Sequence, residues 1–192
     1  MKIHIIDLRQ SSGDQSCLDN SFDNIKRRLF LRRSAYQQLA KEEGFSYISW
    51  NCPYCGSSKH GRPTTKTASV SSSSYGNWAV IAFAPRTMAI GIDITPKRPP
   101  SEAEGIAEAF FTPGELCQRP TGGWQEGVGF SEIWAAKEAL GKAQGIGLAI
   151  DHPNHPGGAL DTSTHAELLS RFTGQHGLPP HLTCRAAVIS TQ

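Results

Sequence analysis

The segment Met88–Ile94 constrains the fold of this chain more than any other. Its three isoleucines fall on one face of an extended strand, whereas Gly91 and Asp93 fall on the other face. This period of two predicts a β-strand with one face in a core. On the opposite face, the carboxylate of Asp93 needs a hydrogen bond, a cationic partner or a metal if it is buried. The strand is therefore expected to belong both to a core and to a functional site.

Other segments alternate between helix and strand patterns. Further strands are expected at Met1–Leu8, Phe45–Trp50, Trp78–Ala84 and Leu182–Ile189. Helices are expected at Phe22–Glu43 (with Ser21 as N-cap and Gly44 as stop), Glu102–Phe111, Phe130–Gln144 and His165–Phe172. The serine run 69–74 leads directly into a strand, so we interpret it as part of the fold and not as a linker. The pattern predicts an α+β protein of two similar halves, residues 1–90 and 91–192, in one compact unit.

Length and composition exclude several classes of protein. A chain of 192 residues can bury about 70% of its unfolded surface, so it needs no disulfide or metal to fold. Hydrophobic residues at 38% and charged residues at 19% exclude wholesale disorder. No apolar run approaches the roughly 18 residues of a membrane span, and the N-terminal segment predicts a strand, not a signal peptide. Five cysteines, an odd number, favour a reducing, cytoplasmic location.

Charge is distributed unevenly along the chain. Residues 1–90 hold 12 Lys or Arg and 6 Asp or Glu, a net charge of +6, whereas residues 91–192 hold 7 and 11, a net charge of −4. The first half is therefore suited to an anionic ligand, and the second half to a metal or another cation. The overall balance lacks the strong basicity of a nucleic-acid binder.

The helix expected at Phe130–Gln144 groups an acid, two bases and an aromatic ring. At about 100° per residue, an arc of about 140° holds four side chains, Trp134, Lys137, Glu138 and Lys142. One interpretation is an exposed Glu138–Lys142 ion pair worth about 0.2–0.5 kcal/mol, with Trp134 in the core. Gly141 argues mildly against it, because a glycine inside a helix costs about 1 kcal/mol relative to alanine and usually has a reason.

Asp93 also has two interpretations. It either caps a neighbouring loop at the end of its strand, or it forms a hard-cation site that Glu138 completes. Mg²⁺ suits the second interpretation, because this ion binds a few carboxylate oxygens and keeps water and phosphate in its remaining positions.

Two further motifs leave alternatives open. Arg28 and Arg32 lie four residues apart on the first helix, either as solvated charges or as a clamp for a diphosphate. Cys52 and Cys55 form a CxxC pair with His60 nearby, but a zinc site needs a fourth ligand that the sequence does not identify. A redox pair would need a thioredoxin-like setting, which is missing, and a zinc-stabilised interaction domain would explain none of the motifs after residue 90. Two further histidines, His152 and His155, are expected at the surface.

Three blocks resemble one known family. The order and spacing of these blocks resemble the motifs of the 4′-phosphopantetheinyl transferase family. The blocks are Gly91-Ile92-Asp93, Phe111-Thr112-Pro113-Gly114-Glu115 and Trp134-Ala135-Ala136-Lys137-Glu138-Ala139-Leu140-Gly141-Lys142. The length resembles the longer, surfactin-synthetase-type form, which implies a monomer. The implied fold has two pseudo-symmetric α/β halves, each a small antiparallel sheet packed by a long helix.

The resemblance implies transfer of 4′-phosphopantetheine from coenzyme A to a serine of an acyl, peptidyl or polyketide carrier protein, with release of 3′,5′-ADP. It implies that Asp93 and Glu138 hold Mg²⁺ and that Glu138, directly or through water, accepts the serine proton. Lys142 is assigned to the diphosphate and Lys137 to phosphate binding. Glu115, Trp134 and Thr95 are supporting residues.

Upstream residues extend the resemblance and depart from it. Arg62, in His60-Gly61-Arg62-Pro63, resembles the basic residue of a Gly-Lys-Pro element that contacts the nucleotide end of coenzyme A. Ser71, Ser72 and Ser73 resemble a Ser-His-Ser element, with Ser72 in place of a histidine that binds the 3′-phosphate. Thr95 stands where many members have a third metal-binding carboxylate.

These departures define a rival function, a non-catalytic relative that binds coenzyme A or a carrier protein. Ser72 and Thr95 favour the rival. The intact set of acid and base residues favours the enzyme, because a binding module does not need an acid and a base side by side.

Overall fold

The computed structural model describes most of the chain. The described residues are 1–12, 22–52, 55–58, 61–124, 128–148, 151–152, 155–156, 161–172 and 177–190. The predicted N-cap Ser21 and His60, the histidine near the CxxC pair, lie outside these residues. In the described helices, no segment is both long and apolar enough to cross a membrane.

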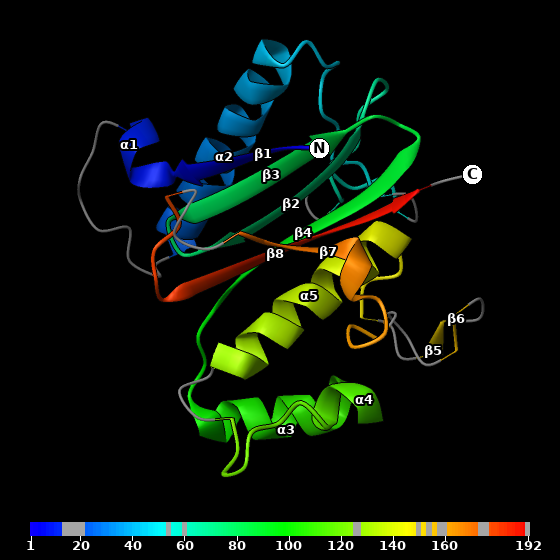
Figure 1. Ribbon diagram of the computed structural model, residues 1–192. Coiled ribbons are helices and arrows are strands. Elements are labelled where there is room, and N and C mark those ends of the chain that lie inside the picture. Colours follow the sequence, from blue (N-terminus) through cyan, green and yellow to red (C-terminus); the bar gives the residue numbers. More distant parts are fainter. Residues whose placement is uncertain are drawn as a thin grey trace.

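The first sheet consists of β1 (Lys2–Asp7), β2 (Ser69–Tyr75) and β3 (Trp78–Ala84), all antiparallel, in the order β1-β3-β2. The long helix α2 (Phe22–Glu42) packs on one face of this sheet, and the short helix α1 (Leu8–Ser12) follows β1 (Figure 1). Tyr36 and Ala40 of α2 are buried in the core against Ile81 and Phe83 of β3. The strand β3 is apolar on both faces because a second core lies behind it.

The second sheet has the order β4-β8-β7, from β4 (Met88–Pro96), β7 (Leu169–Phe172) and β8 (Leu182–Ser190). The helix α5 (Val128–Gln144) lies along β4 and β8, and α3 (Pro100–Phe110) and α4 (Pro113–Leu116) lie near one end of α5 (Figure 1). A small hairpin, β5 (Asp151–His152) with β6 (His155–Pro156), projects beside α5. The described part of the chain is thus a mixed α+β fold with small antiparallel sheets, as predicted.

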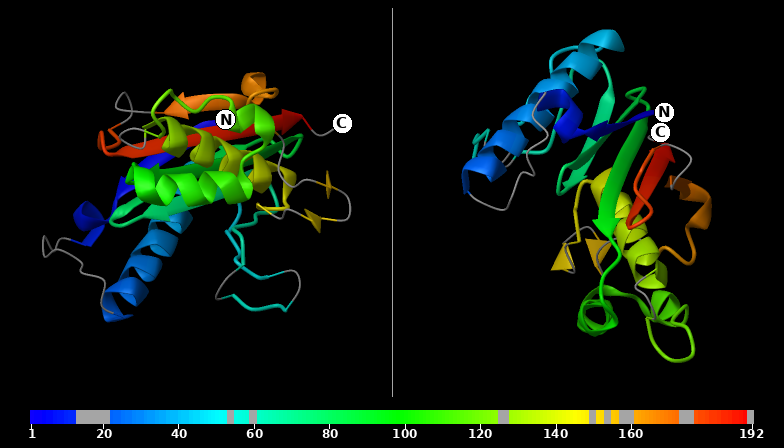
Figure 2. Two further views of the ribbon diagram at one scale, coloured as in Figure 1. Left: turned by 90° about the horizontal axis from the view of Figure 1, so that it is seen from below. Right: turned by 90° about the vertical axis from the view of Figure 1, so that its left-hand side faces the viewer.

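The two three-stranded sheets have the same strand order. In each sheet the strand that comes last in the sequence (β3 or β8) lies in the middle, between the first (β1 or β4) and the second (β2 or β7). Each sheet carries one long helix, and Figure 2 shows α2 and α5 on opposite sides of the strands. The symmetric relation of two halves, and their division into residues 1–90 and 91–192, stay predictions.

The two sheets share one core. Val80 and Ala82 of β3 contact Ile92 and Ile94 of β4, and Ala186 of β8 joins the same cluster. The predicted alternation of β4 is confirmed, because its isoleucines enter this core while Gly91 and Asp93 face α5. The edge strand β2 lies beside β4, so residues of the first sheet reach the α5 side of the second.

Two secondary-structure predictions were wrong. Phe45–Trp50 forms no strand beyond one bridge, Ser49 with Thr64, because the side-chain amide of Gln37 bonds both backbone groups of Ile48 instead. His165–Phe172 is not a helix: a 3₁₀ turn, Ala166–Leu168, leads into β7, whose backbone pairs with β8. In both places a tertiary partner overrides the local pattern.

Candidate active site

The close contact between β4 and α5 determines the geometry of the site. A Cβ atom added to Gly91 would lie 1.8 Å from the carbonyl oxygen of Ala139, so any side chain at this position would push the helix away. The backbone of α5 therefore packs directly against β4 at Gly91, two residues from Asp93. Likewise, a Cβ at Gly141 would lie 2.1 Å from the carbonyl oxygen of Gly147, which explains the glycine inside the helix.

Asp93 is buried and receives two hydrogen bonds on the same oxygen. Lys142 Nζ and Ser73 Oγ each lie 2.7 Å from Asp93 Oδ1. Lys142 Nζ also donates to the backbone carbonyl of Ile92 at 3.2 Å. The predicted exposed Glu138–Lys142 pair is therefore not the observed one, because Lys142 pairs with the carboxylate inside the strand.

Glu138 lies close enough to Asp93 for their charges to interact. Burial raises the pKa of Glu138, the negative charge of Asp93 raises it further, and Lys142 opposes both effects. Two carboxylates, from β4 and α5, thus interact through their charges, and the ammonium group of Lys142 interacts with both.

This donor set fits a hard divalent cation. A cation held by Asp93 and Glu138 would remove their mutual repulsion, and oxygen is the donor atom that Mg²⁺ prefers. Thr95 follows Asp93 on the same face of β4 and is buried, so it brings no third carboxylate. Among the described residues, no group of three Asp, Glu, His or Cys side chains could hold a metal. Two carboxylates suit Mg²⁺, which usually keeps several waters and binds substrate phosphates.

Lys137 and Glu115 form a second, buried pair. Lys137 Nζ lies 3.0 Å from Glu115 Oε2, and the two side chains are 5% and 0% exposed. Glu115 also accepts the backbone N–H groups of Thr112 and Thr162, each at 2.9 Å. Because Glu115 is the N3 residue of a capping box on α4, this pair joins α4 and the loop at residue 162 to α5.

Trp134 packs away from Asp93. Its ring stacks on Phe130 at 5.9 Å and meets the edge of Phe110 of α3 at 5.6 Å. The four side chains expected on one arc of α5 are therefore divided. Glu138 and Lys142 join Asp93, whereas Trp134 and Lys137 pack toward α3 and α4.

The serine run forms β2, and its side chains alternate between two environments. Ser71 is buried, and its Oγ accepts the backbone N–H of Ile92 at 3.1 Å, while Ser73 donates to Asp93. Ser72 lies on the other face of β2, toward α2 and Tyr36. Ser74 shares that side.

Ser74 is a candidate site residue that the sequence did not predict. Its Oγ accepts a hydrogen bond from Arg32, one of the two arginines predicted to bind coenzyme A, and Arg28 lies one turn earlier on α2. The period of two along a strand, had it been applied to the serine run, would have paired Ser74 with Ser72 and separated both from Ser73.

Arg62 reaches from the first half to the end of α5. A Cβ at Gly145, just after the helix, would lie 3.2 Å from Arg62 Nη1. The preceding residue, Gly61, fits tightly against the chain, because a Cβ there would lie 1.5 Å from the carbonyl oxygen of Trp50.

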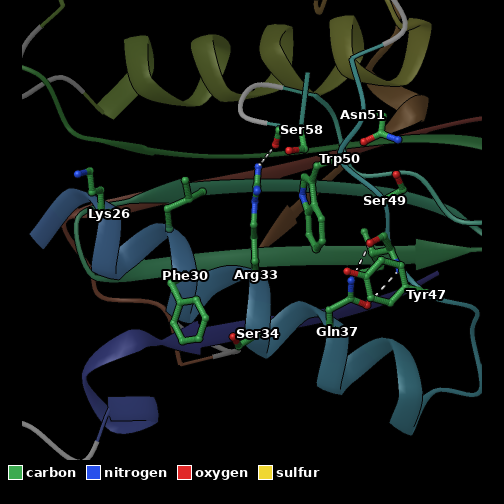
Figure 3. Close-up of a pocket in the computed structure, with 12 residues that line it drawn as sticks. Lys26, Phe30, Arg33, Ser34, Gln37, Tyr47, Ser49, Trp50, Asn51 and Ser58 are labelled. Carbon is green, nitrogen blue, oxygen red and sulfur yellow. Dashed lines mark hydrogen bonds between the residues drawn. The ribbon is translucent and has the colours of Figure 1, made fainter. Parts of the chain in front are cut away.

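The side chain of Arg33 on α2 contacts two described residues that precede Arg62 in the chain, Trp50 and Ser58. Figure 3 shows the guanidinium of Arg33 alongside the ring of Trp50, 5.0 Å from its centroid, while the same group donates to the carbonyl of Ser58 at 2.6 Å. These residues line an open groove of about 520 Å³, at whose rim Phe30 and Tyr47 are 69% and 76% exposed.

A comparison with models of protein families matches part of this chain. No curated protein matches the chain. Residues 89–179 match the sequence model of the 4′-phosphopantetheinyl transferase superfamily. This segment, just under half of the chain, begins in β4 and ends before β8, and it holds Asp93, Glu115, Glu138 and Lys142. The part of the chain that builds most of the candidate site is thus similar to the 4′-phosphopantetheinyl transferase superfamily.

Proposed function

We propose that this protein is a 4′-phosphopantetheinyl transferase of the longer, monomeric type, acting on a carrier protein in the cytoplasm. One observation supports the proposal most. Asp93, Glu138 and Lys142 meet between β4 and α5, inside the segment that matches the superfamily. An acid pair next to an ammonium group suits phosphoryl chemistry, in which positioning and charge neutralisation do most of the work.

The nucleotide end of coenzyme A is assigned to the first half. Arg32 on α2, with Arg28 one turn away, and Arg62 near the end of α5 offer guanidinium groups for phosphates. Ser74 sits beside Arg32, so it is a better substitute for a phosphate-binding histidine than Ser72, which faces Tyr36.

Asp93 and Glu138 are the residues that would hold Mg²⁺, which supplies charge neutralisation at the diphosphate when bound. Lys142 lies at the same place and carries the positive charge that this chain itself contributes. We assign it to the diphosphate, where it stabilises charge that develops on the leaving group.

The reaction proposed is an in-line displacement at the β-phosphorus of coenzyme A. The hydroxyl oxygen of the carrier serine forms a bond to this phosphorus, and the bond from phosphorus to the bridging oxygen of the diphosphate breaks. The bridging oxygen leaves with 3′,5′-ADP. Glu138 is placed to accept the proton of the serine hydroxyl.

The buried pair of Lys137 and Glu115 stabilises the packing of α5 on α4. Because the Lys137 side chain is 5% exposed and its ammonium bonds Glu115, Lys137 holds α4 against α5 in this conformation. The phosphate contact assigned to Lys137 stays a prediction, and Trp134 supports the same region through its aromatic neighbours.

The rival function, a binding relative without catalysis, is supported by Thr95 in place of a third carboxylate. One experiment separates the two functions. The protein is incubated with coenzyme A, Mg²⁺ and an apo carrier protein, and intact-mass spectrometry follows the carrier. Transfer adds one phosphopantetheine to wild-type carrier and nothing to a carrier whose acceptor serine is alanine. Binding of coenzyme A without any gain in carrier mass would establish the rival.

A further inference from the structure

A side chain from the first sheet contacts the central carboxylate of the second. β2 and β4 lie beside each other without being partners in one ladder, and two serines of β2 bridge them. Ser71 Oγ accepts the N–H of Ile92 at 3.1 Å, and Ser73 Oγ donates to Asp93 Oδ1 at 2.7 Å. Two serines on the same face of β2 thus bond a backbone group of β4, the N–H of Ile92, and a side chain of β4, the carboxylate of Asp93.

The two donors to Asp93 Oδ1 differ in stiffness and charge. Lys142 reaches the carboxylate through a flexible four-carbon stem, and its side chain is partly exposed. Ser73 lies on a strand and carries its hydroxyl one carbon from the backbone, so it has a single side-chain torsion to the oxygen atom. Lys142 can therefore leave Asp93 for a substrate phosphate, whereas Ser73 can stay.

We infer that Ser73 is a positioning residue, which holds the Asp93 carboxylate in the orientation needed to bind a divalent cation when Lys142 turns to the diphosphate. The inference rests on the proposed function. Both hydrogen bonds end on Oδ1, so they fix the rotation of the carboxylate and direct Oδ2 away from the donors. Partners of metal-binding carboxylates act in this way in general, and their loss typically weakens metal affinity about 10–100-fold.

The serine run supplies matched variants for the test. Ser73→Ala removes the hydroxyl that contacts Asp93, and Ser73→Thr keeps a hydroxyl. Ser72→Ala removes the neighbouring hydroxyl, which faces α2 and Tyr36 instead. All three changes lie in the same strand, so a general effect on β2 would appear in Ser72→Ala as well.

The experiment measures Mg²⁺ binding by isothermal titration calorimetry on protein saturated with coenzyme A. Carrier protein is left out, so no turnover occurs and the readout is independent of activity. We expect Ser73→Ala to bind Mg²⁺ about tenfold more weakly, Ser73→Thr to lie within about threefold of wild type, and Ser72→Ala to match it. Circular dichroism verifies that each variant is folded.

Two results would overturn the inference: unchanged Mg²⁺ affinity in folded Ser73→Ala, or an equal loss in Ser72→Ala. Failure of this inference differs from failure of the proposed function. If wild-type protein transfers phosphopantetheine and Ser73→Ala binds Mg²⁺ normally, the function stands and the positioning role falls. If wild-type protein binds Mg²⁺ but never transfers, the function falls, and the weaker binding of Ser73→Ala still supports the role of Ser73. Absence of Mg²⁺ binding to wild-type protein would contradict both the proposed Mg²⁺-dependent function and the positioning role of Ser73.

Discussion

Replacement of Lys137 by methionine should be among the most destabilising single changes in this protein. The substitution keeps the length of the apolar stem but removes the ammonium that lies 3.0 Å from Glu115 Oε2. Glu115 is 0% exposed, so its carboxylate would have no cation beside it and no water to replace one. Removal of one partner from a buried ion pair costs about 3–5 kcal/mol, a large part of the roughly 5–15 kcal/mol that stabilises a typical domain.

Two backbone hydrogen bonds moderate this cost without cancelling it. The N–H groups of Thr112 and Thr162 still donate to Glu115 in the variant, but neither carries a full charge. For a chain of this size, each kcal/mol lowers the melting temperature by about 2–4 °C, so we expect a fall of about 6–20 °C. Urea unfolding followed by circular dichroism gives the free energy of unfolding directly.

The double variant Glu115→Gln with Lys137→Met is the matched control. It removes both charges, so it should recover part of the stability that Lys137→Met loses. If Lys137→Met lowers the free energy of unfolding by less than about 1 kcal/mol and raises the KM for coenzyme A, the stabilising role of the buried Lys137–Glu115 pair is wrong. Lys137 would then act on phosphate, as its place in the sequence motif implies.

Three further predictions concern the other face of α5 and the serine strand. Lys142→Ala should lower kcat by about a hundredfold with a smaller change in the KM for coenzyme A, whereas near-normal turnover in steady-state assays would remove this lysine from the mechanism. Because the pKa of Glu138 is raised in the fold, its ionised form destabilises the metal-free protein above the unfolded-state pKa. Glu138→Gln should therefore raise the melting temperature at pH 7 in the presence of a chelator, and this gain should shrink as the pH falls toward about 4, which thermal scans at both pH values will check. Ser74→His should tighten coenzyme A binding, because an imidazolium beside Arg32 adds a charge-assisted hydrogen bond to phosphate, while Ser72→His should not; equal calorimetric affinities of the two variants would contradict this assignment.

The elements that the sequence predicted well have strong local patterns. The alternation of β4 and the helical run that became α5 depend on neighbours within a few residues, so the existence of both elements and the two faces of β4 could be predicted from the sequence. The placement of Asp93 as a buried carboxylate that needs a partner followed from the same alternation.

The parts that failed depend on partners distant in sequence. The segment that became β7 has a helical pattern but pairs with β8, and in residues 45–50 both backbone groups of Ile48 bond the side chain of Gln37 instead of a neighbouring strand. The arc of α5 was predicted as one face, but Lys137 and Trp134 contact α4 and α3 on one side, while Lys142 bonds Asp93 of β4 on the other. Helical angles alone cannot show which neighbouring element covers each part of an arc.

The role of the serine run needed the pairing of β2 with β3. In a run of identical residues, the sequence contains no mark of which hydroxyl faces which side. The register, in which Ser73 pairs with Val80 and Ser74 with Ala79, decides that Ser73 meets Asp93 and Ser74 meets Arg32.

One measurement tests directly whether Asp93 supports transfer of phosphopantetheine from coenzyme A. It is the amount of 3′,5′-ADP released per carrier protein modified, compared between wild-type protein and Asp93→Asn. The variant keeps the shape of the side chain but removes the charge that Mg²⁺ and Lys142 both require. We expect one 3′,5′-ADP for each phosphopantetheine added by wild-type protein, and neither product from folded Asp93→Asn at limiting Mg²⁺. Substantial turnover by Asp93→Asn under these conditions would contradict this expectation.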